Sequence, residues 1–254
     1  MTCADEVNKQ AVAAAFSRAA AGYDSAALLQ RQVGERLLGM GTDHSGQQVL
    51  DAGCGTGYFS QRWRALGKQV IALDLAAGML AFARQQQAAD HYLLGDIEQL
   101  PLPDASVDIC FSNLVVQWCD DLPRALAELY RVTRPGGLIL FSTLTQGALH
   151  ELATAWQQVD AGQHVNDFLP PEQIRAACRP YRHQIEPVLQ RCYYPDVISV
   201  MRSLKGIGAT HLHHGREAGL LSRQRLAALQ AAYPRQQTEC PLSYHLVYGV
   251  IYRD

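Results

Sequence analysis

The sequence lacks any hydrophobic run long enough to cross a membrane, although 48% of its 254 residues are hydrophobic. A membrane-spanning helix needs about 18 or more consecutive apolar residues. The N-terminal segment also lacks a basic stretch followed by an apolar core, so no signal peptide is predicted. The net charge is only −2, which gives no indication of nucleic-acid binding. We therefore expect a cytoplasmic protein whose partners include neither a membrane nor nucleic acid.

Paired cysteines are also missing, because none of the 7 cysteines forms a Cys-x-x-Cys motif. An odd number of scattered cysteines predicts neither a disulfide framework nor a zinc site, and it suits a reducing compartment. His211, His213 and His214 stand close together in the sequence, but no cysteine or carboxylate accompanies them at ligand spacing. We therefore expect no metal.

Short apolar segments alternate with helical segments through the first part of the chain. This rhythm is typical of a parallel, doubly wound sheet. An alanine-rich helix over 8–22, which we expect to end near Gly22, and a second helix over 25–40 precede it. We expect Arg134–Gly137 to end the last of these helices and to turn into the next strand. The predicted strands are 48–52, 69–74, 91–94, 107–112 and 137–143, and the predicted helices between them are 58–66, 77–87 and 122–132.

The rhythm changes after residue 144. Two extended segments, 184–193 and 243–252, are predicted to pair at the edge of the sheet. About fifty residues separate these two strands, and we interpret them as a cap over a ligand. The helices expected in this part of the chain are 146–160, 171–179, 196–204 and 222–232.

A glycine-rich turn follows the first predicted strand. Its spacing is Asp-x-Gly-x-Gly-x-Gly, formed by Asp51, Gly53, Gly55 and Gly57. Glycines between a strand and a helix allow the backbone to approach a ligand closely, because they carry no Cβ atom. The alternative is a strand-turn-helix corner that binds nothing.

Polar residues follow the other strands as well, and ligands of open α/β sheets bind beyond these strand ends. Asp74 stands where a carboxylate can accept hydrogen bonds from ribose hydroxyls, although it could instead cap helix 77–87. After the third strand, Asp96 could bind an adenine amino group and Ile97 could pack on the ring. The remaining candidates are Leu75 after the second strand, and Asn113 and Leu114 after the fourth.

With these motifs at four strand ends and at Arg134–Gly137, the core resembles the class I methyltransferases that use S-adenosylmethionine (SAM). The resemblance implies an α/β, Rossmann-like fold whose mostly parallel seven-stranded sheet carries an inserted helical cap. It also implies SAM as cofactor and S-adenosylhomocysteine as product. The implied organisation is N-terminal helices closing over the cofactor, a SAM-binding core, a helical substrate cap and a final core strand, at residues 1–40, 41–193, 194–240 and 241–254.

Segments outside the core are similar to the malonyl-acyl-carrier-protein O-methyltransferases of biotin synthesis, the BioC type. The similar segments are 7–24, 168–171, 202–211 and 244–246. This resemblance implies a monomeric enzyme that methylates the free carboxylate of malonyl-acyl-carrier protein, the first step of pimeloyl formation. Two alternatives are a methyltransferase for a free small carboxylic acid or a quinone precursor, and a SAM-binding regulator without activity.

The expected substrate needs no general base, because its carboxylate is already ionised near neutral pH. A guanidinium could grip that carboxylate, and Arg202 is our first candidate, with Lys205 and His211 beside it. Arg202 could equally be an exposed helix-end charge or a contact to acidic groups of the carrier protein. Tyr23 could close over the cofactor or the substrate, or it could simply pack between helices. Because carrier proteins of such families are acidic, we expect a basic surface on the cap.

Overall fold

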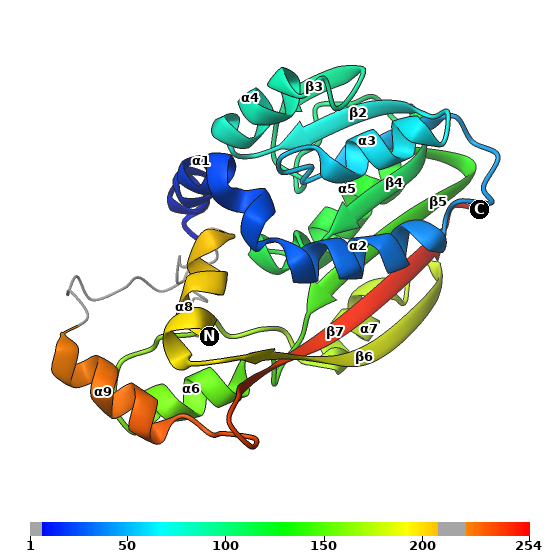
Figure 1. The fold of residues 1–254 in the computed structure, drawn as a ribbon. Helices are drawn as coiled ribbons and strands as arrows, with labels where there is room; N and C mark the ends of the chain where they lie inside the picture. The colour runs from blue at the N-terminus through cyan, green and yellow to red at the C-terminus, as the bar shows by residue number, and fades with distance from the viewer. Residues whose placement is uncertain (1–6, 208–221) are drawn as a thin grey trace.

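The computed structural model describes residues 7–207 and 222–254. A single seven-stranded sheet runs through them in the order β3-β2-β1-β4-β5-β7-β6 (Figure 1). The strands from β3 to β5 are parallel, whereas β7 runs antiparallel to both of its neighbours. The predicted α/β class with a mostly parallel, seven-stranded sheet is confirmed. The strands are β1 (Gln48–Ala52), β2 (Gln69–Asp74), β3 (His91–Leu94), β4 (Val107–Asn113), β5 (Thr133–Leu144), β6 (Arg182–Tyr194) and β7 (Cys240–Tyr252).

Helices cover both faces of the sheet because successive side chains of a strand point to opposite faces. In β4, Ile109 and Phe111 pack toward α2 and α3, whereas Cys110 packs toward α5 and α7. The helices are α1 (Lys9–Ala26), α2 (Leu28–Gly39), α3 (Tyr58–Ala65), α4 (Ala77–Gln85), α5 (Leu122–Val132), α6 (His150–Gln157), α7 (Pro171–Cys178), α8 (Val197–Gly206) and α9 (Arg223–Ala232), with the 3₁₀ helix η1 (Val116–Trp118).

Several boundary predictions are wrong. The helix predicted over 146–160 covers only His150–Gln157, as α6. Gly22 does not end the first helix, since α1 continues to Ala26. A glycine inside a helix costs about 1 kcal/mol relative to alanine, which the surrounding alanines and the packing of α1 against α4 and α8 offset. Likewise, Arg134–Gly137 does not form a separate turn but belongs to the start of β5. Its backbone pairs with the chain end, because Gly136 N donates to Arg253 O and Arg253 N donates to Gly137 O.

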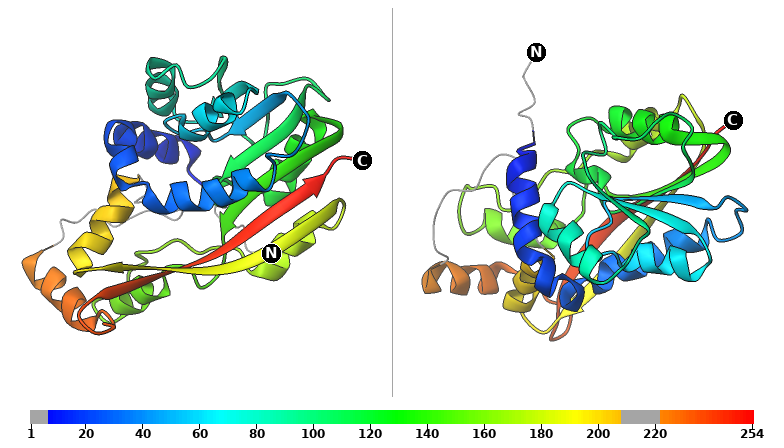
Figure 2. Two further views of the ribbon diagram at one scale, coloured as in Figure 1. Left: turned by 45° about the vertical axis from the view of Figure 1, so that its right-hand side comes forward. Right: turned by 90° about the horizontal axis from the view of Figure 1, so that it is seen from above.

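The long strands β6 and β7 pair along their whole length, from Arg182 opposite Tyr252 to Tyr194 opposite Cys240. The predicted pairing of the last two strands at the sheet edge agrees with this register. Helices α8 and α9 come between the two strands in the chain and lie at the same end of the molecule as α6 (Figures 1 and 2). None of the described helices is long and apolar enough to cross a membrane.

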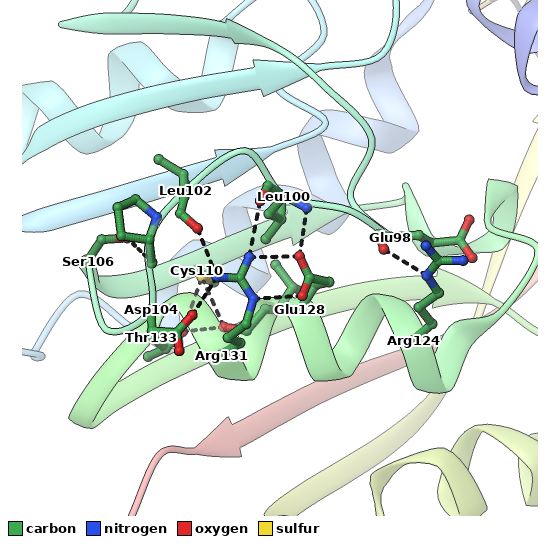
Figure 3. Close-up of polar contacts among 12 residues, drawn as sticks. Glu98, Leu100, Leu102, Asp104, Ser106, Cys110, Arg124, Glu128, Arg131 and Thr133 are labelled. Atoms are coloured by element: carbon green, nitrogen blue, oxygen red, sulfur yellow. Dashed lines mark hydrogen bonds and ion pairs between the residues drawn. The ribbon is translucent and has the colours of Figure 1, made fainter.

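The loop after β3 is fastened to α5 by Arg131 (Figure 3). Its guanidinium donates to Leu100 O at 3.1 Å and to Leu102 O at 2.8 Å. It also binds both carboxylate oxygens of Glu128 and one of Asp104. The hydrogen bonds from Arg131 lower the pKa of the Glu128 carboxyl and outweigh burial, which raises it. Arg131 thereby fixes the loop at Leu100 and Leu102, shortly after Asp96 and Ile97.

We expect Arg131→Ala to lower the free energy of unfolding by about 1–3 kcal/mol, because two carbonyl groups and the carboxylates of Glu128 and Asp104 lose its hydrogen bonds. Arg131→Lys should restore little, since an ammonium cannot bridge these acceptors in fork geometry. Chemical denaturation measures both effects. Arg124→Ala, which removes one bond to Glu98 O, is the matched control. Equal stability of Arg131→Ala and this control would contradict the prediction.

Candidate functional site

The glycine-rich turn follows β1, and its three glycines have a left-handed backbone conformation. Gly53, Gly55 and Gly57 have φ angles of 84°, 55° and 87°, which side-chain-bearing residues rarely adopt. A Cβ atom on Gly53 would lie 2.2 Å from Val115 Cγ2, so close packing also requires glycine there. A Cβ atom on Gly55, by contrast, would have no heavy atom within 4 Å. Space is therefore open beside Gly55, as a ligand cradle requires.

Asp74 joins the ends of β1 and β2. Its Oδ2 accepts a hydrogen bond from Gly55 N, and its Oδ1 accepts one from Ala76 N, each at 2.8 Å. Each carboxylate oxygen retains acceptor capacity, because an ionised carboxylate can accept about four hydrogen bonds. The N-terminal cap position of α4 belongs to Ala76, so Asp74 is not the capping residue of that helix. Burial raises the pKa of Asp74 to about 6 against the lowering effect of these bonds.

Asp51 and Gly57 support the turn from behind. Asp51 is only 2% exposed, and its Oδ2 accepts a hydrogen bond from Ser60 Oγ at 2.6 Å. Burial raises its pKa to about 7, with a smaller contribution from the charge of Asp74. Gly57 is the N-cap residue of α3, and a Cβ atom on it would lie 2.4 Å from Ala88 Cβ. Both residues support the shape of the turn. Direct binding of the cofactor by either of them stays a prediction.

Asp96 lies at the end of β3 and faces the N-terminal helix. Its Oδ2 accepts a hydrogen bond from Lys9 Nζ at 2.6 Å, while its Oδ1 accepts from Glu98 N at 2.9 Å. Lys9 also pairs with the buried Glu98 and, at 3.4 Å, with Asp120. Burial lowers the pKa of Lys9, but its bonds to Asp96 and Glu98 outweigh burial and raise it above the ordinary value. The Lys9 charge therefore holds α1 beside the predicted adenine site. No sequence pattern predicts this contact.

Asn113 and Leu114 end β4 in a constrained arrangement. The Asn113 side chain donates to Gln30 O at 2.9 Å and accepts from Ser142 Oγ at 2.8 Å. Leu114 has a φ of 56°, and its N–H lies 3.1 Å from Ser142 O. The Asn113 amide thus ties α2 to β5, which leaves backbone and the Leu114 side chain to meet a ligand.

These strand ends surround one hollow of about 700 Å³, which we call the strand-end cavity. Lys9, Phe16 and Trp118 complete its wall from α1 and η1. It is lined by eight of the ten residues predicted to bind the cofactor, namely Gly53, Gly55, Asp74, Leu75, Asp96, Ile97, Asn113 and Leu114.

A second hollow of about 1020 Å³, the apolar cavity, adjoins the first. Both cavities share Phe16, Tyr23, Leu114 and Trp118 as lining residues. The rings of Phe16 and Trp118 meet edge to face, with centroids 5.4 Å apart. The apolar cavity is otherwise lined by α2, α8, β7 and a stretch that runs from Leu144 to Phe168.

No sequence pattern predicts a role for that stretch, because the cap is expected only between the last two strands. Leu149, Leu152 and Trp156 of the stretch line the cavity from α6 and the residue before it. Their spacing is that of any amphipathic helix, and only Phe168 lay in a segment that the resemblance had singled out.

The residues predicted to bind the substrate lie in different places in the structure. Tyr23 lines both cavities, and burial raises its pKa, with further contributions from Asp74 and Asp24. Arg202 and Lys205 are exposed on α8, whereas Met201 and Leu204 of the same helix line the apolar cavity. Neither Arg202 nor Lys205 lines the apolar cavity, and a contact of either with the substrate carboxylate stays a prediction. His211 lies outside the described residues.

The residues of the strand-end cavity fit SAM. The open space beside Gly55 allows a ligand to approach the backbone of the turn closely. Asp74, which lines the cavity, can still accept hydrogen bonds. Ile97, only 6% exposed, supplies an apolar wall next to Asp96. Within residues 7–207 and 222–254, no three histidine, cysteine or carboxylate side chains cluster as a metal site would require.

Comparison with known proteins identifies closely similar sequences. The family described as "Methyltransferase domain" matches residues 50–141. The chain is 73% identical to a "Malonyl-[acyl-carrier protein] O-methyltransferase" from Serratia marcescens over 98% of both chains. A protein of the same name from Yersinia pestis is 70% identical, over 98% of this chain and 93% of the relative. A third, from Salmonella typhimurium, is 53% identical over 98% of this chain and 99% of the relative.

Solved structures with the same fold are much less similar in sequence. The YcgJ protein from Bacillus subtilis is 17% identical, with a TM-score of 0.58 over 87% of this chain and 99% of that chain. The [4+2]-cyclase SpnF is 18% identical, with a TM-score of 0.52 over 89% of this chain and 80% of that chain. At such identities the likeness shows the fold alone.

We expect SAM affinity to increase as the pH rises through about 6. Burial raises the pKa of Asp74 to about 6 in the free protein, whereas hydrogen bonds from ribose hydroxyls favour its ionised form. Binding should therefore release a proton, and the dissociation constant should fall with pH and level off above the pKa. Calorimetric titrations from about pH 5 to pH 8 measure this dependence.

Asp74→Asn is the variant for this prediction. It should bind SAM more weakly and lose most of the pH dependence, because its amide does not titrate. Asp51, whose pKa is raised to about 7, remains in the variant and accounts for any smaller dependence that persists. An unchanged pH dependence in Asp74→Asn would contradict the assignment.

Proposed function

The chain belongs to the malonyl-[acyl-carrier protein] O-methyltransferases, and we propose that it transfers a methyl group from SAM to the free carboxylate of malonyl-acyl-carrier protein. Membership of this family confirms the resemblance predicted from the sequence. It also makes SAM the cofactor of this enzyme. The methyl ester that results is the product expected at the start of pimeloyl formation for biotin.

One observation carries the proposal: a cavity that fits SAM adjoins an apolar cavity through four shared residues. Bound in the strand-end cavity, SAM supplies a methyl group already activated by a sulfonium sulfur. The shared wall of Phe16, Tyr23, Leu114 and Trp118 is then where the methyl group and the carboxylate meet. A SAM-binding regulator without activity would not need an open apolar cavity at this place.

The residues of the apolar cavity orient the substrate and exclude water. An ionised carboxylate needs no general base, so alignment of its oxygen with the methyl carbon is the main requirement. The aromatic and aliphatic lining removes water from the carboxylate, which raises its reactivity. The raised pKa of Tyr23 keeps its phenol protonated. We assign Tyr23 the role of hydrogen-bond donor at the junction of the two cavities.

We propose that the predicted divisions of the chain act as follows. The helices within residues 1–40 close the strand-end cavity, and the Lys9 contacts to Asp96 and Glu98 support this role. The segment 194–240 covers the substrate together with the stretch from Leu144 to Phe168, since α8 and this stretch line the same cavity. Residues 41–193 and 241–254 supply the sheet.

The direct test incubates malonyl-acyl-carrier protein with the enzyme and SAM and follows the carrier protein by mass spectrometry. We expect a gain of one methyl group together with S-adenosylhomocysteine. Malonyl methyl ester on the same carrier is the control, and it should gain nothing because its carboxylate is blocked. Faster methylation of a free small carboxylic acid than of the carrier thioester would overturn the proposed substrate.

The exposed positions of Arg202 and Lys205 support a role in binding the acidic carrier protein. We expect the double variant Arg202→Ala, Lys205→Ala to raise KM for malonyl-acyl-carrier protein by about three- to tenfold at low salt, because rim charges act on association. KM for malonyl-coenzyme A should change little, and high salt should reduce the difference between the variant and the original enzyme.

Arg175→Ala, Arg179→Ala is the matched control, since Arg175 is exposed on α7 and Arg179 is exposed directly after it, and α7 lies away from α8 (Figure 1). This control should leave KM unchanged for both substrates. An equal rise of KM for the carrier and coenzyme A thioesters in the Arg202, Lys205 variant would show that these residues contact the malonyl group instead.

A further inference from the structure

The apolar cavity offers few groups that could hold an anionic substrate. Among the described residues that line it, His164 is the only one whose side chain can carry a positive charge. A carboxylate that leaves water for such a cavity needs a charged or hydrogen-bonding partner, because its desolvation is otherwise costly. Neither Arg202 nor Lys205 lines this cavity, so His164 is the candidate for that partner.

His164 is held in place on two sides. Its Nε2 lies 2.7 Å from Asp160 Oδ1, and its ring stacks on Trp156 with centroids 3.9 Å apart and planes 18° apart. Asp160 also forms an ion pair with Arg225 of α9. The Arg225 guanidinium in turn lies 5.7 Å from the centroid of the Trp156 ring. The imidazole is therefore fixed between α6 and α9, and its Nε2 is already engaged.

The other ring nitrogen is unused. Nδ1 of His164 is buried and has no hydrogen-bond partner among the described residues. Buried polar atoms are nearly always hydrogen-bonded, so the unpaired Nδ1 of a residue that lines the cavity is a candidate for a ligand contact. With Nε2–H donated to Asp160, an imidazolium presents Nδ1–H as its second donor.

Asp160 is a negatively charged partner for the His164 ring. Its hydrogen bond with His164, followed by that with Arg225, holds the pKa of Asp160 well below its usual range, so this carboxylate is ionised. An ionised carboxylate at Nε2 accepts a hydrogen bond from that nitrogen and fixes the orientation of the ring. A substrate carboxylate could accept a second hydrogen bond from Nδ1–H of the doubly protonated ring.

We propose that His164 binds the free carboxylate of the substrate through Nδ1 and that Asp160 positions the ring for this contact. This inference rests on the proposed function and names the residue that recognises the acid. It also gives a basis for selectivity: methylation removes the negative charge, so the ester product loses the charge-assisted hydrogen bond and binds more weakly.

Two substitutions of the same residue separate this role from a structural one. In His164→Asn the side-chain amide takes the place of Nδ1, whereas in His164→Gln it takes the place of Nε2. We expect His164→Gln to keep a partner for Asp160 but to raise KM for malonyl-acyl-carrier protein about tenfold or more, because the lost bond is to a charged group. His164→Asn should show a smaller rise, since it still offers a donor toward the substrate.

Calorimetry with SAM and thermal unfolding complete the experiment. SAM affinity should stay near that of the original enzyme in both variants. If His164 only braces Asp160 and α9, the order reverses: His164→Gln keeps its KM and its melting temperature, and His164→Asn loses both. That order, or equal KM values for all three proteins, would overturn the proposal. Absence of methylation by the unsubstituted enzyme would instead contradict the proposed function itself.

A measurement on the unsubstituted enzyme guards against variants that fail to fold. Malonyl-acyl-carrier protein and its methyl ester are compared as ligands of the enzyme saturated with S-adenosylhomocysteine. We expect the free acid to bind about tenfold more tightly than the ester, the loss expected for one charge-assisted bond. Equal affinities would exclude recognition of the carboxylate by a charged partner in this cavity.

Discussion

The hydrogen bond from Gly55 N to the Asp74 carboxylate is the contact on which the site depends. It joins the turn after β1 to the end of β2, and the same carboxylate accepts from Ala76 N at the start of α4. The turn can make this contact only because Gly53 and Gly55 adopt left-handed conformations. Two strands, one helix and a partly buried negative charge are thereby fixed around one edge of the strand-end cavity.

The closure of the site depends on charge at one end and on apolar packing at the other. Lys9 brings the start of α1 to Asp96 and to the buried Glu98, so the helix that covers the strand-end cavity is held by ion pairs. The apolar cavity, by contrast, is enclosed mainly by aromatic and aliphatic side chains from α6 and α8. Phe16 of α1 and Trp118 of η1 belong to both cavities and connect the two kinds of wall.

This division suits the chemistry of carboxyl methylation. The cofactor needs polar anchors for its sugar and base, whereas the acid and the methyl group react best where water is excluded. An excess of cations inside the apolar cavity would hold the carboxylate too well and would be costly to bury. His164, fixed by Asp160 and Trp156, is the one described residue of this mainly apolar wall whose side chain can carry a positive charge.

The sequence by itself determined the sheet and the strand ends, because both depend on short-range patterns: apolar runs, glycine spacing and the residues that directly follow each strand. Asp74, Asp96 and Leu114 could therefore be assigned to one edge of the sheet before any coordinates were considered. Only the tertiary structure decided that Arg202 faces outward while His164 lines the apolar cavity. Such positions follow from the packing of segments far apart in the chain, such as Asp160 against Arg225, for which no local pattern exists.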